Sequence, residues 1–320
     1  MFTTRKNKTR RFANEMDGFR TGINKHLKEV VNMISPSEGI GSEDVSRAIK
    51  YCMCVEDSYG PKRIRPMLVL LVIKALGMEI NVAHQTVACA LEIAHIASLI
   101  HDDLPGVDNS DFRHGKKALH VASPDIGWGV GLAIHVGAGL EYDLFRLLSD
   151  RQLLKSFSTK QMISVIAEIS MALGCSGVMQ GQVADLKTAG HTRTLSDIAN
   201  IRDKKTGMLI RACMATGCIL GRATHMQRLA LDFYGRCLGD VWQLRDDALD
   251  IESSPEKLGK PTKLDSANKQ ATYASLCGIE QTQRLIDELV TRAHKSIVVA
   301  KLKDPSRLIA LIDWAAIRDR

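Results

Sequence analysis

Apolar residues recur at intervals of three and four along almost the whole 320-residue chain, and strand-like alternation is nearly absent. Aromatic residues make up only 5% of the sequence, so small aliphatic side chains fill most apolar positions. This composition suits packing of helix on helix better than a β-sandwich. No low-complexity linker or internal repeat interrupts the pattern. The sequence therefore predicts one all-α domain.

Clusters of proline and glycine mark the ends of the predicted helices. The expected helices span residues 12–34, 42–56, 63–77, 84–103, 126–149, 159–175, 177–188, 195–222, 225–252, 268–302 and 305–318. Residues 1–13 carry five basic side chains and no acid, and we expect them to form a flexible basic tail before a domain of residues 14–320. An organellar address is the alternative interpretation of this tail, although the stretch is short and poor in serine.

Composition argues against several classes of protein. The net charge is +7, but lysine and arginine are dispersed and no set of stacking aromatics accompanies them, which argues against nucleic-acid binding. No apolar run approaches the roughly 20 residues of a transmembrane helix. The eight cysteines form neither a paired CxxC set nor a zinc pattern. We expect reduced thiols and a cytoplasmic location.

Two predicted helices, residues 86–101 and 225–252, are apolar on most faces and carry aspartates at their C-terminal ends. The first leads into Asp102, Asp103 and Asp108, and the second contains Asp246, Asp247 and Asp250. A helix C-terminus bears partial negative charge, and like charges four residues apart destabilise a helix further. An unfavourable arrangement that occurs twice indicates a missing positive charge.

A hard divalent cation would supply that charge. Magnesium prefers oxygen ligands and is usually bound by one or two carboxylates together with substrate phosphates. Calcium is less well supported, because no EF-hand loop of alternating acids is present. The alternative is that both clusters are solvated aspartates at helix ends, which leaves their repetition unexplained. The two clusters therefore predict a site for magnesium and a diphosphate.

Basic residues are placed to bind the phosphates. Lys62 and Arg65 share one face at the start of a predicted helix, where backbone N–H groups favour anions. Arg113 follows the first cluster, Lys204-Lys205-Thr206-Gly207 lies mid-chain, and Lys257 and Lys260 follow the second cluster. Each of these, taken alone, is compatible with a solvated surface charge.

A histidine also lies close to the first cluster in sequence. His95 precedes Asp102 by two helical turns on the same face of the predicted helix. It is compatible with a hydrogen-bonded core residue and with a substrate contact.

These residues lie in motifs that resemble those of the trans-isoprenyl diphosphate synthases, the family that includes farnesyl and geranylgeranyl diphosphate synthases. The similarity runs from about residue 55 to the C-terminus. The motifs are GPKRIRP, LIHDDLPGVDNSDFRHGK, GQVADL, KKTG, and GDVWQLRDDALD followed by LGKPTKLD. Two aspartate-rich motifs at this separation, with a KxxR segment ahead of them and KT between them, make the resemblance specific.

The resemblance implies a helical bundle around a deep central cavity, usually a homodimer. It implies head-to-tail condensation of isopentenyl diphosphate with an allylic diphosphate, with three magnesium ions in each active site. The proton would be lost to the diphosphate, so no side-chain base is needed.

The resemblance also assigns roles to individual residues. The implied metal ligands are Asp102, Asp103, Asp108, Asp246, Asp247 and Asp250. The implied allylic contacts are Arg113, Lys205, Thr206, Gln243 and Lys260, and the implied isopentenyl diphosphate contacts are Lys62, Arg65 and His95. The implied catalytic set is Asp102, Asp103, Asp108, Arg113, Lys205 and Asp246.

Three positions depart from the family pattern. His114 replaces the second of two arginines, Ala138 replaces an aspartate, and Trp242 replaces a phenylalanine. The resemblance implies that the second arginine helps bind isopentenyl diphosphate. A histidine in its place carries full charge only below its pKa, which is near 6.5 when unperturbed, so we expect weaker and pH-sensitive binding of that substrate. The departures leave room for a weakly active or regulatory subunit. A terpene cyclase is the third reading, although such an enzyme normally lacks the KxxR segment.

The length of the product depends on the floor of the cavity. Residues four and five before Asp102 lie about one helical turn deeper, and these are Ser98 and Ala97. Both are small, where farnesyl-producing members tend to have an aromatic residue. The expected product is therefore geranylgeranyl diphosphate, with farnesyl diphosphate as the next choice.

Overall fold

A computed structural model describes residues 2–55, 61–122, 129–188, 191–252 and 272–318. Within these ranges the chain is helical apart from one short hairpin, which confirms the predicted all-α class. The elements are α1 (Phe2–Ile34), α2 (Ser42–Met53), α3 (Ile64–Ala75), α4 (Val82–Asp102), β1 (Phe112–Arg113), β2 (Lys116–Lys117), α5 (Leu119–Ala122), α6 (Gly129–Leu148), α7 (Leu153–Ser156), α8 (Thr159–Leu173), α9 (Val178–Thr188), α10 (Leu195–Arg202), the π-helical turn η1 (Asp203–Gly207), α11 (Met208–Leu220), α12 (His225–Glu252), α15 (Tyr273–Cys277), α16 (Ile279–Ala300) and α17 (Ser306–Ile317).

Contacts between Cα atoms divide the chain into two compact units. The α12 unit comprises residues 1–17, 68–80 and 163–320, and the α4 unit comprises residues 18–67 and 81–162. Residues 2–13 belong to α1, so no break in secondary structure occurs at the predicted tail boundary. The flexibility of that tail stays a prediction.

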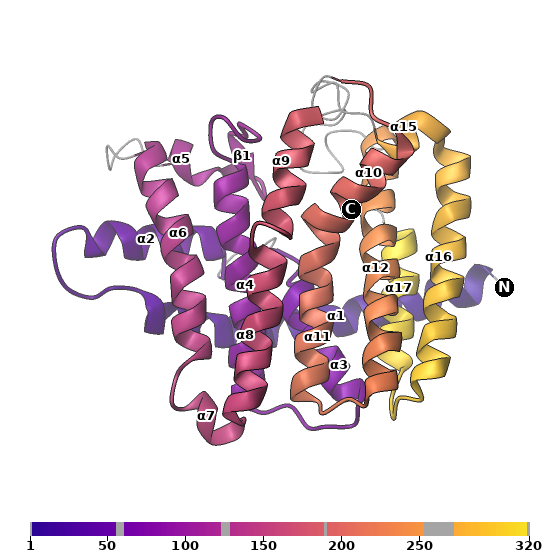
Figure 1. Ribbon diagram of the computed structural model, residues 1–320, viewed down its shortest axis with the longest axis horizontal. Helices are drawn as coiled ribbons and strands as arrows, with labels where there is room; N and C mark the ends of the chain where they lie inside the picture. Colours follow the sequence, from indigo (N-terminus) through magenta and orange to yellow (C-terminus); the bar gives the residue numbers. More distant parts are fainter. Residues whose placement is uncertain (1, 56–60, 123–128, 189–190, 253–271, 319–320) are drawn as a thin grey trace. The chain divides into compact units, whose positions relative to one another are not determined.

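Helix α4 is the central helix of the α4 unit, where it packs along α6 and also contacts α2 (Figure 1). A capping box starts the helix: the Asn81 side chain accepts a hydrogen bond from the His84 backbone N–H, and the Asn81 backbone N–H donates to the His84 ring. Because most of its side chains are buried, its nearly uniform apolar sequence is explained by packing on several sides.

Helix α12, with 28 residues, is the longest described helix of the α12 unit, and it packs against α11, α16 and α17 (Figure 1). Tyr234 is fully buried on it, and its hydroxyl donates to the backbone carbonyl of Leu308 at 2.7 Å. On α11, Gly217 lets Val72 of α3 approach closely, since a Cβ at Gly217 would lie 2.7 Å from the Val72 Cβ. The absence of a side chain at Gly217 thus sets the distance between α11 and α3.

Two predicted helices are interrupted. The span 195–222 consists of α10, η1 and α11, because the KKTG segment forms a π-helical turn. The described part of 268–302 is broken at Gly278, whose φ of +83° favours glycine. The hairpin and the four-residue helices α5 and α7 were not predicted, because they are too short to produce a periodic pattern.

Two helical segments, Val82–Asp102 and Thr159–Thr188, are long and apolar enough to cross a membrane by length and composition. The apolar window of the first is 67% buried, as expected for a core helix. The second joins α8 and α9 through a turn and is 33% buried. Its component helices have 15 and 11 residues, fewer than the roughly 20 needed to span a bilayer.

Candidate active site

The first aspartate motif forms a compact turn at the end of α4. Asp102 is the last residue of the helix, and its carbonyl accepts a hydrogen bond of 2.8 Å from the backbone N–H of Asp108. The carbonyl of Asp103 accepts another, of 3.1 Å, from the backbone N–H of Ser110. Gly106, with a φ of +93°, allows the chain to reverse. The backbone therefore brings Asp102 and Asp108 to the same end of α4.

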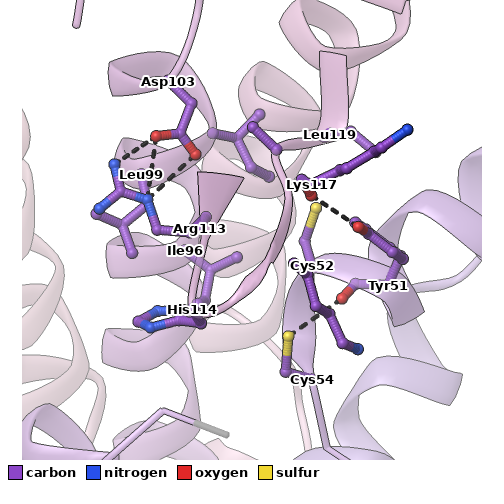
Figure 2. Close-up of a pocket in the computed structure, with 13 residues that line it drawn as sticks. Tyr51, Cys52, Cys54, Ile96, Leu99, Asp103, Arg113, His114, Lys117 and Leu119 are labelled. Carbon is purple, nitrogen blue, oxygen red and sulfur yellow. Dashed lines mark hydrogen bonds and ion pairs between the residues drawn. The ribbon is translucent and has the colours of Figure 1, made fainter. Parts of the chain in front are cut away.

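Asp103 and Arg113 form an ion pair in which Asp103 is buried and Arg113 is half-buried (Figure 2). Only 3% of Asp103 is exposed, and Arg113 Nε lies 3.0 and 3.2 Å from its two carboxylate oxygens while Nη2 also donates to Oδ1. Burial raises the pKa of Asp103 and outweighs the opposing effect of Arg113. One of the three predicted acids is thus already neutralised by a predicted substrate ligand.

Arg113 and His114 lie in the β1–β2 hairpin. Phe112 pairs with Lys117 and Arg113 with Lys116, so His114 and Gly115 are the two turn residues, with φ of +51° and +76°. Positive φ at both positions is typical of the tight hairpin turn that matches the twist of the strands. The turn places His114 beside Arg113.

Several predicted isopentenyl diphosphate contacts gather in the α4 unit. Burial lowers the pKa of His95 well below its usual range, and the charges of Arg65, His114 and Arg113 lower it further. His114 lies in an exposed turn, yet the protein atoms around its ring and the charges of Arg113, Arg63 and Lys62 lower its pKa to about 4. These residues therefore share one positive region in which both histidines are neutral near pH 7.

Arg63 is a structural residue that the sequence did not single out. It is 1% exposed, and it donates to Glu92 Oε1 at 2.8 Å, to Asn24 Oδ1 at 2.8 Å and to the carbonyl of Met53. This buried network anchors the turn that carries the flanking Lys62. Glu92, the one acid within the apolar stretch 86–101, was the available signal.

The predicted residues of the α12 unit begin with Lys205 on η1. Its Nζ lies 2.8 Å from Asp185 Oδ2, and Arg193 Nη2 lies 2.7 Å from Asp185 Oδ1. Gly181 lets α9 pack directly against η1, since a Cβ at this position would lie 2.4 Å from the backbone nitrogen of Lys205. Asp185, from the GQVADL motif, thus positions Lys205. The pairing of Arg193 with the same carboxylate was not predicted from the sequence.

A hydrogen-bonded series links η1 with the second aspartate motif. The Thr206 hydroxyl donates to Gln243 Oε1 at 3.3 Å, and Gln243 Nε2 donates to Asp247 Oδ1 at 3.0 Å. Asp247 is buried, whereas Asp246 and Asp250 are half-buried. A π-helical turn at this point agrees with the frequent occurrence of such turns at functional sites. Three predicted residues are therefore in contact.

Asp246 pairs with an arginine near the C-terminus that was not predicted. Arg318 Nη2 lies 2.8 Å from Asp246 Oδ1 and 3.0 Å from the carbonyl of Trp242. The guanidinium also lies over the Trp242 ring, 4.3 Å from its centroid. No sequence pattern marks Arg318, because it falls outside every motif.

The two residues proposed for chain length differ in exposure. Ala97 is fully buried, whereas Ser98 is half-buried and its hydroxyl donates to the carbonyl of His95 at 2.8 Å. Ser98 shares a helical stripe with His95 and Asp102. Ser98 is therefore the more accessible of the two small residues.

A pocket on the neighbouring stripe of α4 was not predicted (Figure 2). It is lined by Tyr51, Cys52, Cys54, Ile96, Leu99, Ile100, Asp103, Arg113, His114, Lys116, Lys117, Ala118 and Leu119. The Tyr51 hydroxyl donates to the carbonyl of Lys117 at 2.7 Å, which ties α2 to the hairpin. The pocket thus borders the Asp103–Arg113 pair.

Two other predicted features are placed as follows. Ala138 is half-buried on α6 next to Gly137, where a Cβ would lie 2.4 Å from the His101 ring. Lys260 lies outside the described residues.

Among the described residues, no three His, Cys, Asp or Glu side chains are grouped closely enough to hold a metal by themselves.

Comparisons with known proteins agree with this geometry. Residues 46–304 match the family described as polyprenyl synthetase. Farnesyl diphosphate synthase of Geobacillus stearothermophilus is 35% identical over 271 residues, which cover 85% of this chain and 89% of the relative. The chloroplastic geranylgeranyl pyrophosphate synthase of Capsicum annuum is 32% identical over 298 residues, covering 93% and 76%.

Solved structures show the same fold. A geranyltransferase from Legionella pneumophila has a TM-score of 0.78 at 28% identity, with 96% of each chain covered. An FPP/GFPP synthase from Zymomonas mobilis has a TM-score of 0.77 at 26% identity, covering 95% of this chain and 98% of that one. Fold and relatives define an all-α prenyltransferase of the isoprenoid synthase type. The chain belongs to the polyprenyl synthetase family, whose reaction is prenyl chain elongation.

Proposed function

We propose that the protein condenses isopentenyl diphosphate head to tail with an allylic diphosphate, in a magnesium-dependent reaction that yields a short all-trans prenyl diphosphate. One observation in the α4 unit carries this proposal: the turn from Asp102 to Asp108 adjoins the positive region formed by Lys62, Arg65 and Arg113. Acids for a metal and cations for phosphates are the two requirements of diphosphate chemistry.

The donor chemistry of both aspartate motifs fits magnesium. Carboxylate oxygens are its preferred protein ligands, and substrate phosphates complete its shell, so a cluster of protein ligands alone is not required. We assign three ions to six residues: Asp102, Asp103, Asp108, Asp246, Asp247 and Asp250. When bound, magnesium neutralises charge that develops on the leaving diphosphate.

The basic residues have separate roles in the proposal. Arg113, Lys205, Thr206, Gln243 and Lys260 contact the allylic substrate. Arg113 and Lys205 stabilise the departing diphosphate through positive charge that is already in position. Asp103 and Asp185 hold these two cations before substrate arrives.

Isopentenyl diphosphate would be held by Lys62, Arg65 and His95. The lowered pKa of His95 keeps its ring neutral near pH 7, so it contributes a hydrogen bond rather than a charge. The allylic C–O bond breaks and releases diphosphate, and the isopentenyl double bond attacks the resulting allylic cation to form a carbon–carbon bond. The proton then lost from the isopentenyl unit passes to the released diphosphate. Apolar walls would exclude water that would otherwise quench the allylic cation.

We further propose a homodimer located in the cytoplasm. The alternative is an organellar location, with the basic N-terminus as the address. Exposed apolar side chains on α6, including Val130, Ile134 and Tyr142, support an interface with a second copy. Light scattering should then give twice the 35.2 kDa chain mass, and a monomer would refute the dimer.

An assay with purified protein, magnesium, radiolabelled isopentenyl diphosphate and each allylic primer tests the proposal. Chromatography should show an extended prenyl diphosphate, with geranylgeranyl diphosphate as the main product because Ser98 is small and accessible. A cyclic hydrocarbon would instead indicate a terpene cyclase. Absence of any product under all primers would indicate a regulatory subunit.

A further inference from the structure

We infer that Arg318 is a positioning residue that orients the Asp246 carboxylate for metal binding. The inference rests on the proposed role of Asp246 as a metal ligand. Arg318 lies outside the motifs and outside the matched span of residues 46–304, so neither assigns it a role.

Contacts that do not involve Asp246 hold the Arg318 guanidinium in place. It lies over the Trp242 ring at 4.3 Å, and Nη2 donates to the Trp242 carbonyl at 3.0 Å. The backbone carbonyl of Arg318 accepts a hydrogen bond of 2.9 Å from Arg245 Nε. Only 5% of Arg318 is exposed, and tryptophan is the ring that attracts a cation most strongly. The guanidinium is therefore a fixed group.

This fixed group contacts one oxygen of the carboxylate. Arg318 Nη2 lies 2.8 Å from Asp246 Oδ1, while 40% of the Asp246 side chain is exposed. A carboxylate can accept on both oxygens, so the pairing is compatible with a metal at Oδ2. Carboxylates that bind metals are commonly held by such hydrogen bonds, and loss of the partner typically weakens metal binding by about 10- to 100-fold.

A fixed positive charge also repels an incoming cation. Orientation and repulsion predict opposite effects when the guanidinium is removed. If orientation dominates, removal weakens metal binding, whereas repulsion alone would make it tighter. The sign of the change therefore distinguishes a positioning residue from a competing cation.

The test is a titration with Mn²⁺, a paramagnetic substitute for magnesium, of the protein in the presence of inorganic diphosphate, which supplies the phosphate ligands. Binding is followed through the EPR signal of the free ion and corrected with a protein-free diphosphate blank. The binding component that Asp246→Asn removes defines the site. Arg318→Met should weaken this component by about 10- to 100-fold. An affinity equal to or tighter than that of the wild type would overturn the inference.

Two further variants make the result specific. Arg318→Lys keeps the charge but loses the planar contacts, so it should weaken binding by about threefold or more, less than methionine does. If the methionine variant does not fold, the lysine variant decides, and wild-type affinity in it overturns the inference. Arg211→Met is the matched control, because Arg211 pairs at 2.8 Å with Asp232 earlier on α12, and it should leave the affinity unchanged.

The titration separates the two levels of the argument. If Asp246→Asn removes no binding component, the proposed role of Asp246 is wrong. If Asp246→Asn removes one and both Arg318 variants retain it at wild-type affinity, only the inference about Arg318 fails.

Discussion

Among the described side chains, an arginine pairs with an acid of each aspartate motif. Arg113 pairs with Asp103, and Arg318 pairs with Asp246. The sequence indicated that the clustered acids need positive charge, and both arginines provide part of it before any metal binds. Arg113 was predictable because it lies close to its motif, whereas Arg318 is 72 residues from Asp246 in sequence and only folding brings them together.

His114 is the residue whose expected behaviour changes most. An unperturbed histidine would titrate near pH 6.5, but the surroundings lower the pKa of His114 to about 4. In the protein without bound substrate, His114 therefore gains its charge only near pH 4. We now expect the binding of isopentenyl diphosphate to depend on His114 protonation only in that acidic range. Because the folded-state pKa is below the unfolded value, its contribution to stability declines as pH falls from about 6.5 towards 4.

The variant His114→Arg should restore a permanent charge beside the proposed diphosphate site. A charge-assisted hydrogen bond contributes about 1.5–3 kcal/mol, so the KM for isopentenyl diphosphate should fall about tenfold at pH 7. Steady-state kinetics with varied isopentenyl diphosphate measure this effect. His225→Arg, at an exposed position at the start of α12, is the control and should not change KM. An unchanged KM in His114→Arg would show that this position does not contact the substrate.

At the scale of elements, α4 illustrates what periodicity predicts well. Its uniform apolar character predicted a buried helix that ends in aspartates, and the structure starts it two residues earlier, at Val82. The KKTG turn was missed because a single π-helical turn of five residues is too short to produce a periodic pattern of its own. The β1–β2 hairpin was missed because two residues per strand show no alternation, although a glycine follows His114 at the turn.

The exposure of Ser98 on α4 leads to a prediction about product length. Ser98→Phe should place a ring one turn below Asp102 and shift the product from geranylgeranyl towards farnesyl diphosphate. Ala97→Phe, at the other small position singled out from the sequence, should also shorten the product. It acts at a fully buried position and should lower the melting temperature as well, because overpacking costs about 1–3 kcal/mol. Product chromatography and thermal denaturation measure the two effects. An unchanged product in both variants would place the floor elsewhere.

At the scale of the whole molecule, the proposed ligands are divided between the two units. The α4 unit carries the first aspartate motif and the proposed isopentenyl contacts, and the α12 unit carries Lys205, Thr206, Gln243 and the second motif. The sequence predicted the composition of both groups because each lies in a short motif. It could not predict the partners that hold them, such as Glu92 for Arg63, because these are brought together only by tertiary packing.

The claim that both motifs serve one reaction is tested most directly by the rate of isopentenyl diphosphate incorporation at saturating magnesium. Asp102→Asn and Asp246→Asn should each lower kcat by about 100-fold or more, since each removes charge stabilisation of the leaving group. Asp143→Asn, which breaks an exposed ion pair with Arg146 on α6, should retain the wild-type rate. Wild-type turnover in either Asp102→Asn or Asp246→Asn would contradict the account.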